Sequence, residues 1–181
     1  MKIVFLHYNT KFISYESARF YSLINILNYI IILNMERQKR RRRADIAMLE
    51  SSGYLYNYND ENDKTNSVIC LLKGPSDTVY ANGSWKISIT LPSEYPFKSP
   101  SVGFIDRIFH PNVDLKSGSV CLNALNSEWT PVYKLTDIME TLLPQLLTYP
   151  NADDPLNTTA AHLWKTDKDA FSEKVNETKV T

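Results

Sequence analysis

The sequence predicts an α+β fold, with a first helix, a four-stranded antiparallel meander and then further helices. Apolar residues recur at helical spacing over residues 36–50 and again over residues 135–147. Between these stretches lie four strand-like segments with short connections, which is the pattern of a meander. A chain of 181 residues suits one domain with its own core and a modest extension.

The four strand-like segments are separated by turn residues. They are residues 54–58, 67–73, 85–91 and 101–109. The third alternates, with Trp85, Ile87 and Ile89 on one face, and the second is a continuous apolar run that contains Cys70. We therefore expect Trp85 and Cys70 to be structural core residues.

An irregular loop around residue 121 precedes the last three helical stretches. These are residues 135–147, 156–164 and 167–175. Pro144 lies inside the first of them and has no backbone N–H, so it should kink that helix or remove one bond from its ladder.

Residues 1–34 differ in character from residues 35–181, which we expect to form the folded domain. Residues 20–33 are mostly apolar, but these 14 residues would reach about 21 Å as a helix, short of a hydrocarbon core of roughly 30 Å. A membrane anchor is therefore disfavoured, and no small-residue cleavage site indicates a signal peptide. Because Met35 opens a natural helix start, residues 1–34 are interpreted as a disordered or anchoring extension or as sequence upstream of an alternative start.

The formal net charge of zero hides a split between the two ends of the chain. Residues 1–43 carry nine Lys and Arg against two Asp and Glu, whereas residues 44–181 carry eleven against eighteen. The whole chain is therefore not a polycation built for nucleic acid. Residues 39–43 are consistent with a nuclear import signal, a nucleic-acid patch or a solvated helix that presents charge to protein partners, and we favour the last.

Cysteine and histidine are sparse in this chain. Two cysteines, Cys70 and Cys121, do not form a disulfide framework, and no Cys or His pair has zinc-ligand spacing. We expect no metal site and a cytoplasmic or nuclear protein. Cys121 follows His110 by eleven residues, so a Cys–His hydrolase pair is one interpretation. It is disfavoured because the adjacent Pro111 stiffens the turn and no glycine-rich oxyanion turn adjoins the cysteine.

Residues 109–122, FHPNVDLKSGSVCL, resemble the active-site signature of ubiquitin-conjugating enzymes. The upstream pattern GP…Y.NG.W….LP..YPF..P and the downstream pattern W.P…L.….LL..PN..DPLN resemble the same family, over about residues 36–175. Within it, YPFKSP, IFHPN, LPQLL.YPN and DPLN are most similar to the H subgroup, which works with large multisubunit ubiquitin ligases. The resemblance implies the ubiquitin-conjugating-enzyme fold, with residues 35–181 as the catalytic domain.

The resemblance also implies a reaction and its residues. Cys121 would accept ubiquitin from an activating enzyme as a thioester and surrender it to a substrate lysine, usually with a RING-type ligase. Asn112 would either stabilise the oxyanion of that transfer or hold the loop that does. Asp154 would orient or deprotonate the lysine, although capping of the following helix is an equal alternative. No cofactor is implied, because the upstream partner consumes the ATP.

One position departs from the family pattern. Asn123 stands two residues after the cysteine, where many relatives carry an acidic residue. An amide can position a lysine by hydrogen bonding but cannot favour its deprotonation as a carboxylate can, so we expect slower intrinsic transfer.

Partner surfaces follow from the resemblance as well. A RING-type ligase is expected to contact the first helix and two loops, at Arg40, Pro96, Phe97, Pro131 and Val132. Two alternatives remain at this stage, namely an inactive variant that binds ubiquitin without carrying it and a carrier of another ubiquitin-like modifier.

Overall fold

The computed structural model describes residues 15–58, 66–120 and 129–179, and its contacts divide the chain into two units, Met1–Lys39 and Arg40–Thr181. Helix α1 spans Tyr15–Ser51 and passes through the boundary between them. The sequence analysis placed its start near residue 36. The helix begins earlier because neither glycine nor proline interrupts residues 15–51, and it ends before Gly53, whose φ of 75° breaks the helical path.

Four antiparallel strands form one sheet in the order β1-β2-β3-β4, which confirms the predicted meander. Their bounds are Leu55–Asn57 for β1, Ser67–Lys73 for β2, Ser84–Thr90 for β3 and Ser101–Phe104 for β4. Cys70 pairs with Ile87, and Ile87 pairs in turn with Phe104. These three residues are buried and mark the core-facing row of the sheet.

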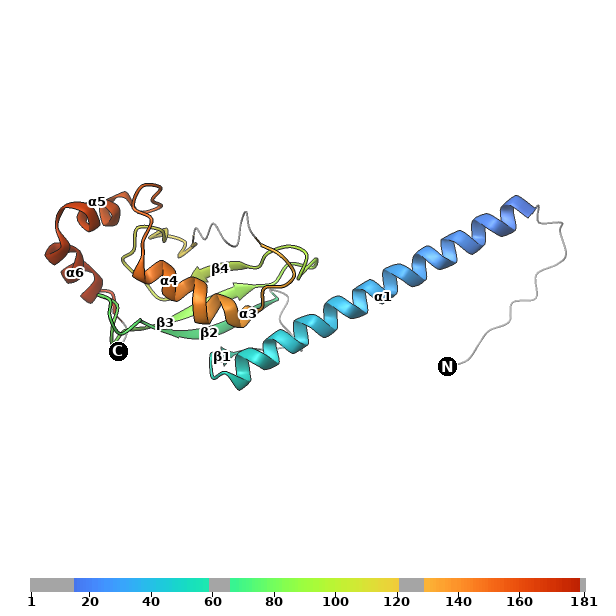
Figure 1. Cartoon of the computed structure of the whole chain (residues 1–181), viewed down its shortest axis with the longest axis horizontal. Helices are drawn as coiled ribbons and strands as arrows, with labels where there is room; N and C mark the ends of the chain where they lie inside the picture. The colour runs from blue at the N-terminus through green and yellow to red at the C-terminus, as the bar shows by residue number, and fades with distance from the viewer. Residues whose placement is uncertain (1–14, 59–65, 121–128, 180–181) are drawn as a thin grey trace. The chain divides into compact units, whose positions relative to one another are not determined.

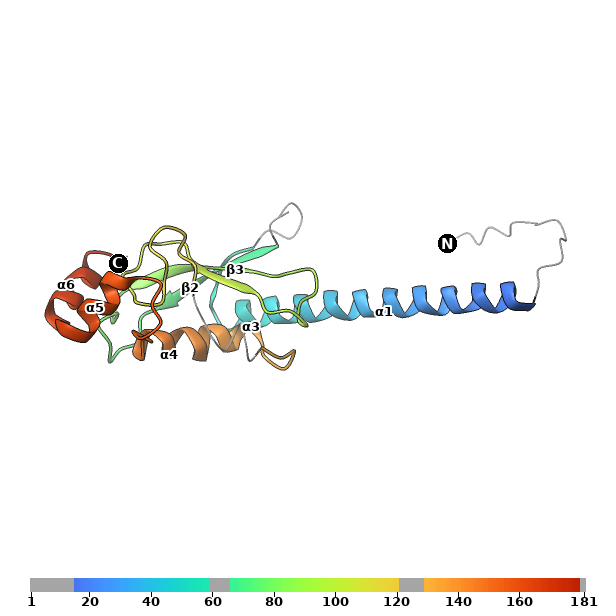
Figure 2. The same ribbon diagram turned by 90° about the horizontal axis from the view of Figure 1, so that it is seen from above.

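Helical segments cover one face of this sheet, as Figures 1 and 2 show. They are α3 (Leu135–Asp137), the π-helical turn η1 (Ile138–Leu142) and α4 (Leu143–Thr148). Leu135, Ile138 and Leu143 are fully buried within the same cluster as the inward strand residues. Burying a leucine or isoleucine side chain contributes about 1.5–3 kcal/mol, so this row of contacts is a main source of stability.

Pro144 explains why this covering segment is not one regular α-helix. Proline has no N–H to donate, and the helix accommodates it with a π-helical turn directly before α4. The predicted loss of a bond at Pro144 therefore takes the form of a local change in helix type.

The remaining helices, α5 (Thr158–Thr166) and α6 (Lys168–Asn176), lie together beside one end of the sheet (Figures 1 and 2). Phe171 of α6 is fully buried and its ring centroid lies 5.6 Å from that of Phe109. The predicted fourth strand was too long, because β4 ends at Phe104 and residues 105–112 leave the sheet to form the site described below.

Within the part of the chain that the structure describes, no helix is both long enough and apolar enough to cross a bilayer. The large apolar side chains of residues 20–33 are nonetheless 38–63% exposed.

Candidate active site

His110 is fully buried and both of its ring nitrogens are occupied. Nδ1 accepts the backbone N–H of Asn112 at 2.9 Å, and Nε2 lies 3.0 Å from the carbonyl oxygen of Leu146. Because Nδ1 accepts, the proton belongs on Nε2, which donates to Leu146. Burial lowers the pKa of His110 to about 4, so the imidazole is neutral at pH 7. His110 is therefore a structural residue with no nitrogen left for a catalytic cysteine, which removes the basis for a Cys–His hydrolase.

The side chain of Asn112 is 2% exposed, and both polar atoms of its amide are hydrogen-bonded to the backbone of residues 151–154. Its Nδ2 donates to the carbonyl oxygens of Asn151 at 2.7 Å and Asp154 at 3.2 Å, and its Oδ1 accepts the N–H of Asn151 at 2.8 Å. Of the two roles expected for Asn112, this geometry matches the one in which the amide holds a loop. An oxyanion contact would require one of these bonds to break.

Pro111 adds a third connection through its backbone. Its carbonyl oxygen accepts the N–H groups of both Leu156 and Asn157 at 2.9 Å. Asn157 is 4% exposed and caps α5, because its side-chain oxygen accepts the N–H of Ala160 at 3.0 Å. We call residues 110–112 and their partners in residues 146–157 the HPN hub. The hub joins two motifs that lie about 40 residues apart in the sequence.

Tyr80 supports the hub from a third part of the sequence. It is fully buried, and its hydroxyl donates to the carbonyl oxygen of Phe109 at 2.9 Å. Gly74 lies against the backbone of Tyr80, where a Cβ at position 74 would come within 1.9 Å of the Tyr80 oxygen. The upstream motif GP…Y thus positions the turn that contains His110. Sequence reasoning recognised this motif but assigned no role to Tyr80.

The segment leading to residue 121 is anchored to β4. Gly103 and Val113 form β-bridges with Ser119 and Val120, respectively, and the N–H of Phe104 donates to the Gly118 carbonyl at 2.8 Å. Gly118 has φ of 69°, and a Cβ there would lie 2.0 Å from the Phe104 oxygen, so only glycine fits. These contacts fix the backbone as far as Val120, the residue before the cysteine in the sequence.

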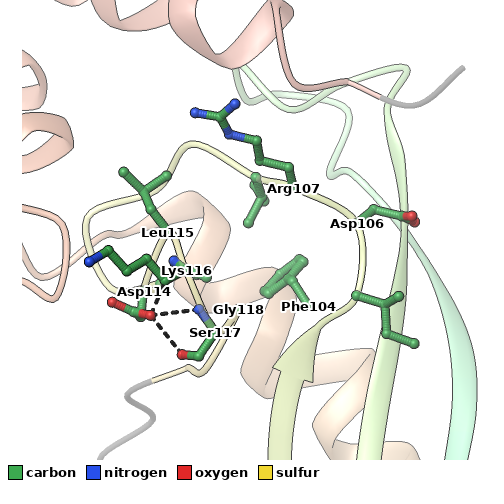
Figure 3. Close-up of a pocket in the computed structure, with 11 residues that line it drawn as sticks. Phe104, Asp106, Arg107, Asp114, Leu115, Lys116, Ser117 and Gly118 are labelled. Atoms are coloured by element: carbon green, nitrogen blue, oxygen red, sulfur yellow. Dashed lines mark hydrogen bonds between the residues drawn. The ribbon is translucent and has the colours of Figure 1, made fainter.

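A tight turn and a small cavity of about 170 Å³ lie along this segment (Figure 3). The carboxylate of Asp114 accepts the Ser117 hydroxyl and the Ser117 N–H, each at 2.7 Å. These bonds, the side-chain bond first, lower the pKa of Asp114 and so keep it ionised. Figure 3 shows Arg107 and Leu115 among the residues that line the cavity.

Cys121 and Asn123 lie outside the described residues. Their predicted roles, as thioester nucleophile and lysine-positioning amide, remain predictions. The other cysteine, Cys70, is fully buried on β2, and burial raises its pKa to about 12, which confirms it as an inert core thiol.

The two neighbouring carboxylates at positions 153 and 154 differ in their surroundings. Asp153 is bonded to Lys165 Nζ at 2.6 Å, and this bond lowers the pKa of Asp153. Asp154 is exposed, and its carboxylate has no partner among the residues described. The alternative that Asp154 caps the next helix is wrong, because Asn157 is the cap. The backbone of Asp154 is also part of the hub, since its carbonyl oxygen accepts a hydrogen bond from Asn112.

The residues expected to meet a ligase lie in two loops and on α1. Phe97 and Val132 are 66% and 82% exposed, and Arg40 and Pro131 are exposed as well. Pro96 differs, because it is buried. A direct contact between its ring and a partner is therefore not expected, and the prediction for Pro96 needs this correction.

Two arginines of the basic run were missed as structural residues. Arg41 donates to the carbonyl oxygens of Pro131 and Tyr133 at 2.7 and 2.5 Å. Arg42 donates to the carbonyl oxygens of Leu91 and Pro92 at 3.1 and 3.0 Å. Arg41 and Arg42 bond to the domain, whereas Arg40 and Arg43 are exposed. A run of four identical residues gives no sign of which side chains have which role. Among the residues described, no cluster of three metal-ligating side chains occurs.

The helix, the four-stranded meander and the hub before Cys121 together define the class of thioester-forming ubiquitin-conjugating proteins. The chain belongs to the ubiquitin-conjugating enzyme family, because the model of that family, described as "Ubiquitin-conjugating enzyme", matches residues 36–179. It is accordingly a ubiquitin transferase, with ubiquitin, an activating enzyme and a ligase as its general partners.

Relatives of known name agree with this assignment. The chain is 46% identical to "Ubiquitin-conjugating enzyme E2 5" of Arabidopsis thaliana over 143 residues, which cover 79% of this chain and 76% of the relative. It is 44% identical to "Ubiquitin-conjugating enzyme E2-24 kDa" of Saccharomyces cerevisiae, over 79% of this chain and 65% of the relative. A putative ubiquitin-conjugating enzyme from Plasmodium yoelii shares the fold, with a TM-score of 0.70, 24% identity and coverage of 78% and 92%.

Proposed function

We propose that Cys121 carries ubiquitin as a thioester and that the HPN hub holds the site for its transfer to a lysine. The observation that carries this proposal is the side chain of Asn112, whose three hydrogen bonds join the turn before Cys121 to residues 151–154. A thioester suits a carrier, because it stores the activation energy and a thiolate leaves more readily than an alkoxide.

Asp154 is the residue proposed to receive the incoming lysine. Its carboxylate is exposed while that of Asp153 is engaged by Lys165, so an ammonium group can approach Asp154 without displacing another cation. Attraction between opposite charges at a few ångströms orients the lysine, and an adjacent carboxylate can take its proton. Asn123 is proposed to help position that lysine by hydrogen bonding.

We further propose that the ligase is of the RING type within a multisubunit assembly, as the H-subgroup motifs imply, and that it binds Arg40, Phe97, Pro131 and Val132. Exposed apolar side chains together with an exposed arginine are the composition expected of a partner surface. Cytoplasmic and nuclear locations are proposed because two cysteines without a disulfide framework suit a reducing compartment.

Charging tests the central proposal. The chain is incubated with activating enzyme, ATP and ubiquitin, and a reducible adduct of one ubiquitin is expected on nonreducing gels. Cys121→Ala should abolish it, whereas Cys70→Ala, the matched control at the buried thiol, should retain it. An adduct that survives Cys121→Ala, or the absence of any adduct with the unmodified chain, would refute the proposal.

The same assay addresses the two alternatives. An inactive ubiquitin-binding variant would form no adduct, and a carrier of another modifier would be charged only when that modifier and its own activating enzyme replace ubiquitin.

A further inference from the structure

A buried carboxylate lies beneath the two loops of the partner surface. Asp45 of α1 is 2% exposed, and its Oδ2 accepts Arg41 Nε at 2.6 Å together with the hydroxyl of Tyr95. Burial, and then the bond to Asp45, raise the pKa of Tyr95, so its hydroxyl stays protonated and donates. A buried charge is tolerated only when it is paired and hydrogen-bonded, and both conditions hold here.

Each partner of Asp45 belongs to, or reaches, a different loop. Tyr95 lies in residues 92–98, the loop that presents Phe97. Arg41 uses its two terminal nitrogens to hold the carbonyl oxygens of Pro131 and Tyr133, in the loop of residues 129–133 that presents Val132. We call these two segments the loop pair. One carboxylate therefore links both members of the pair to α1.

A direct bridge closes the arrangement. Trp129 Nε1 donates to the carbonyl oxygen of Pro96 at 2.8 Å, and the Trp129 ring stacks on that of Tyr133 at 5.6 Å between centroids. Trp129 also lies 6.1 Å from Tyr95 by ring centroids. The loops are thus connected both through Asp45 and through Trp129, while Phe97 and Val132 remain 66% and 82% exposed.

We propose that Arg41, Asp45 and Tyr95 are positioning residues that set the spacing of the loop pair, and that this spacing determines how tightly a RING-type ligase binds. This inference rests on the ligase partner proposed above. Preorganised loops bind a partner more tightly, because fewer conformations are lost on association. The network lies on the loop-pair side of the domain and shares no residue with the HPN hub, so the transfer chemistry itself should not depend on it.

Tyr95→Phe is the most conservative test, because it removes one hydroxyl and keeps the ring. Tyr56→Phe is its matched control, since Tyr56 is 57% exposed on β1. Hydrogen–deuterium exchange is followed at the amides of Phe97 and Tyr133, which donate to Glu94 and Thr130. We expect exchange about tenfold faster in Tyr95→Phe, the effect of losing one hydrogen bond to a charged group, and no change in Tyr56→Phe.

The functional arm uses the charged full chain and a panel of isolated RING domains as probes. In Tyr95→Phe the RING concentration for half-maximal stimulation of lysine discharge should rise about tenfold, while discharge without a RING domain stays within about twofold. Arg41→Lys keeps the charge but cannot hold Asp45 and two carbonyl groups at once, so it should give a similar or larger shift. A general loss of stability would instead lower both rates together.

The outcomes separate this inference from the proposed function. If hydrogen exchange at the amides of Phe97 and Tyr133 is unchanged in Tyr95→Phe and in Arg41→Lys, the positioning role is overturned, whatever the ligase result. If no RING domain stimulates the wild type, the proposed ligase and the binding half of this inference both fail, while the exchange data still decide whether the network holds the loops.

Discussion

The HPN hub and the loop pair are built differently, although both are proposed to serve ubiquitin transfer. In the hub, short side chains and backbone groups bond each other, and Asn112 is buried with every polar atom used. In the loop pair, a long charged side chain from α1 reaches backbone carbonyl groups, and the loop tips stay exposed. The difference is that the hub uses up the polar atoms of its central side chain, whereas the loop pair is bonded from beneath and keeps its tips exposed.

The largest expected effect is that of Asn112→Ala in the hub. It removes three hydrogen bonds that a buried side chain makes to the backbone of Asn151 and Asp154, so the free energy of unfolding should fall by about 3–4 kcal/mol. Urea unfolding measures this fall, and Asn57→Ala at an exposed position is the control. Discharge to lysine should also fall, by about a hundredfold. A loss of discharge with unchanged stability would break the comparison, because it would assign Asn112 to the oxyanion alone.

The second effect is a loss of folding stability at acidic pH, caused by protonation of His110. The unfolded state takes up a proton near pH 6.5, but the folded state does so only near pH 4, so stability is full above pH 6.5 and is lost as the pH falls toward 4. Through His110 this loss should reach about 3 kcal/mol. Urea unfolding at pH 7, 5 and 4 measures it. His110→Gln should flatten the decline, whereas His162→Gln at an exposed site should not; equal declines would contradict the buried neutral imidazole.

A smaller effect distinguishes the two adjacent carboxylates. Asp154→Ala should slow discharge of the charged enzyme to free lysine about tenfold, since an oriented acid–base group is lost. Asp153→Ala should leave the rate nearly unchanged, because its carboxylate is occupied by an exposed ion pair worth little. Single-turnover discharge compares the two. If both substitutions slow discharge equally, the total charge of this segment matters and the different surroundings of the two carboxylates do not.

The smallest effect is a gain. Asn123→Asp should raise discharge to free lysine by about two- to fivefold, because a carboxylate favours deprotonation of the amine and an amide does not. The measurement is the rate without any ligase, and charging by the activating enzyme should be unaffected. If Asn123→Asp discharges no faster than the wild type, position 123 does not limit the intrinsic rate.

Much of the fold was accessible from the sequence, because it depends on local patterns. The alternation of Trp85, Ile87 and Ile89 is a direct sign of one buried sheet face, and all three are fully buried. The site was accessible through its motif, but its construction was not. Nothing local in the sequence shows that Asn112 bonds residue 151 or that Arg41 and Arg42 point to carbonyl groups, because such bonds join distant segments without a repeating pattern.

Errors at element ends have similar causes. The fourth strand was extended past Phe104 because three of residues 105–109 are large and apolar, yet Ile108 and Phe109 are buried as part of a loop. Apolar character records burial and does not distinguish a strand from a buried loop. The early start of α1 was missed because residues 15–34 carry no capping signal that sets them apart from the helix that follows.

The double acceptor role of the Pro111 carbonyl has a consequence for synthesis of the chain. Its donors, Leu156 and Asn157, lie more than 30 residues beyond Cys121, so they leave the ribosome later than the cysteine does. At about 5–20 residues per second, Leu156 and Asn157 are synthesised about 2–7 seconds after Cys121, so the hub cannot close before then. A nascent chain therefore contains the cysteine for several seconds before the bonds that complete the hub can form.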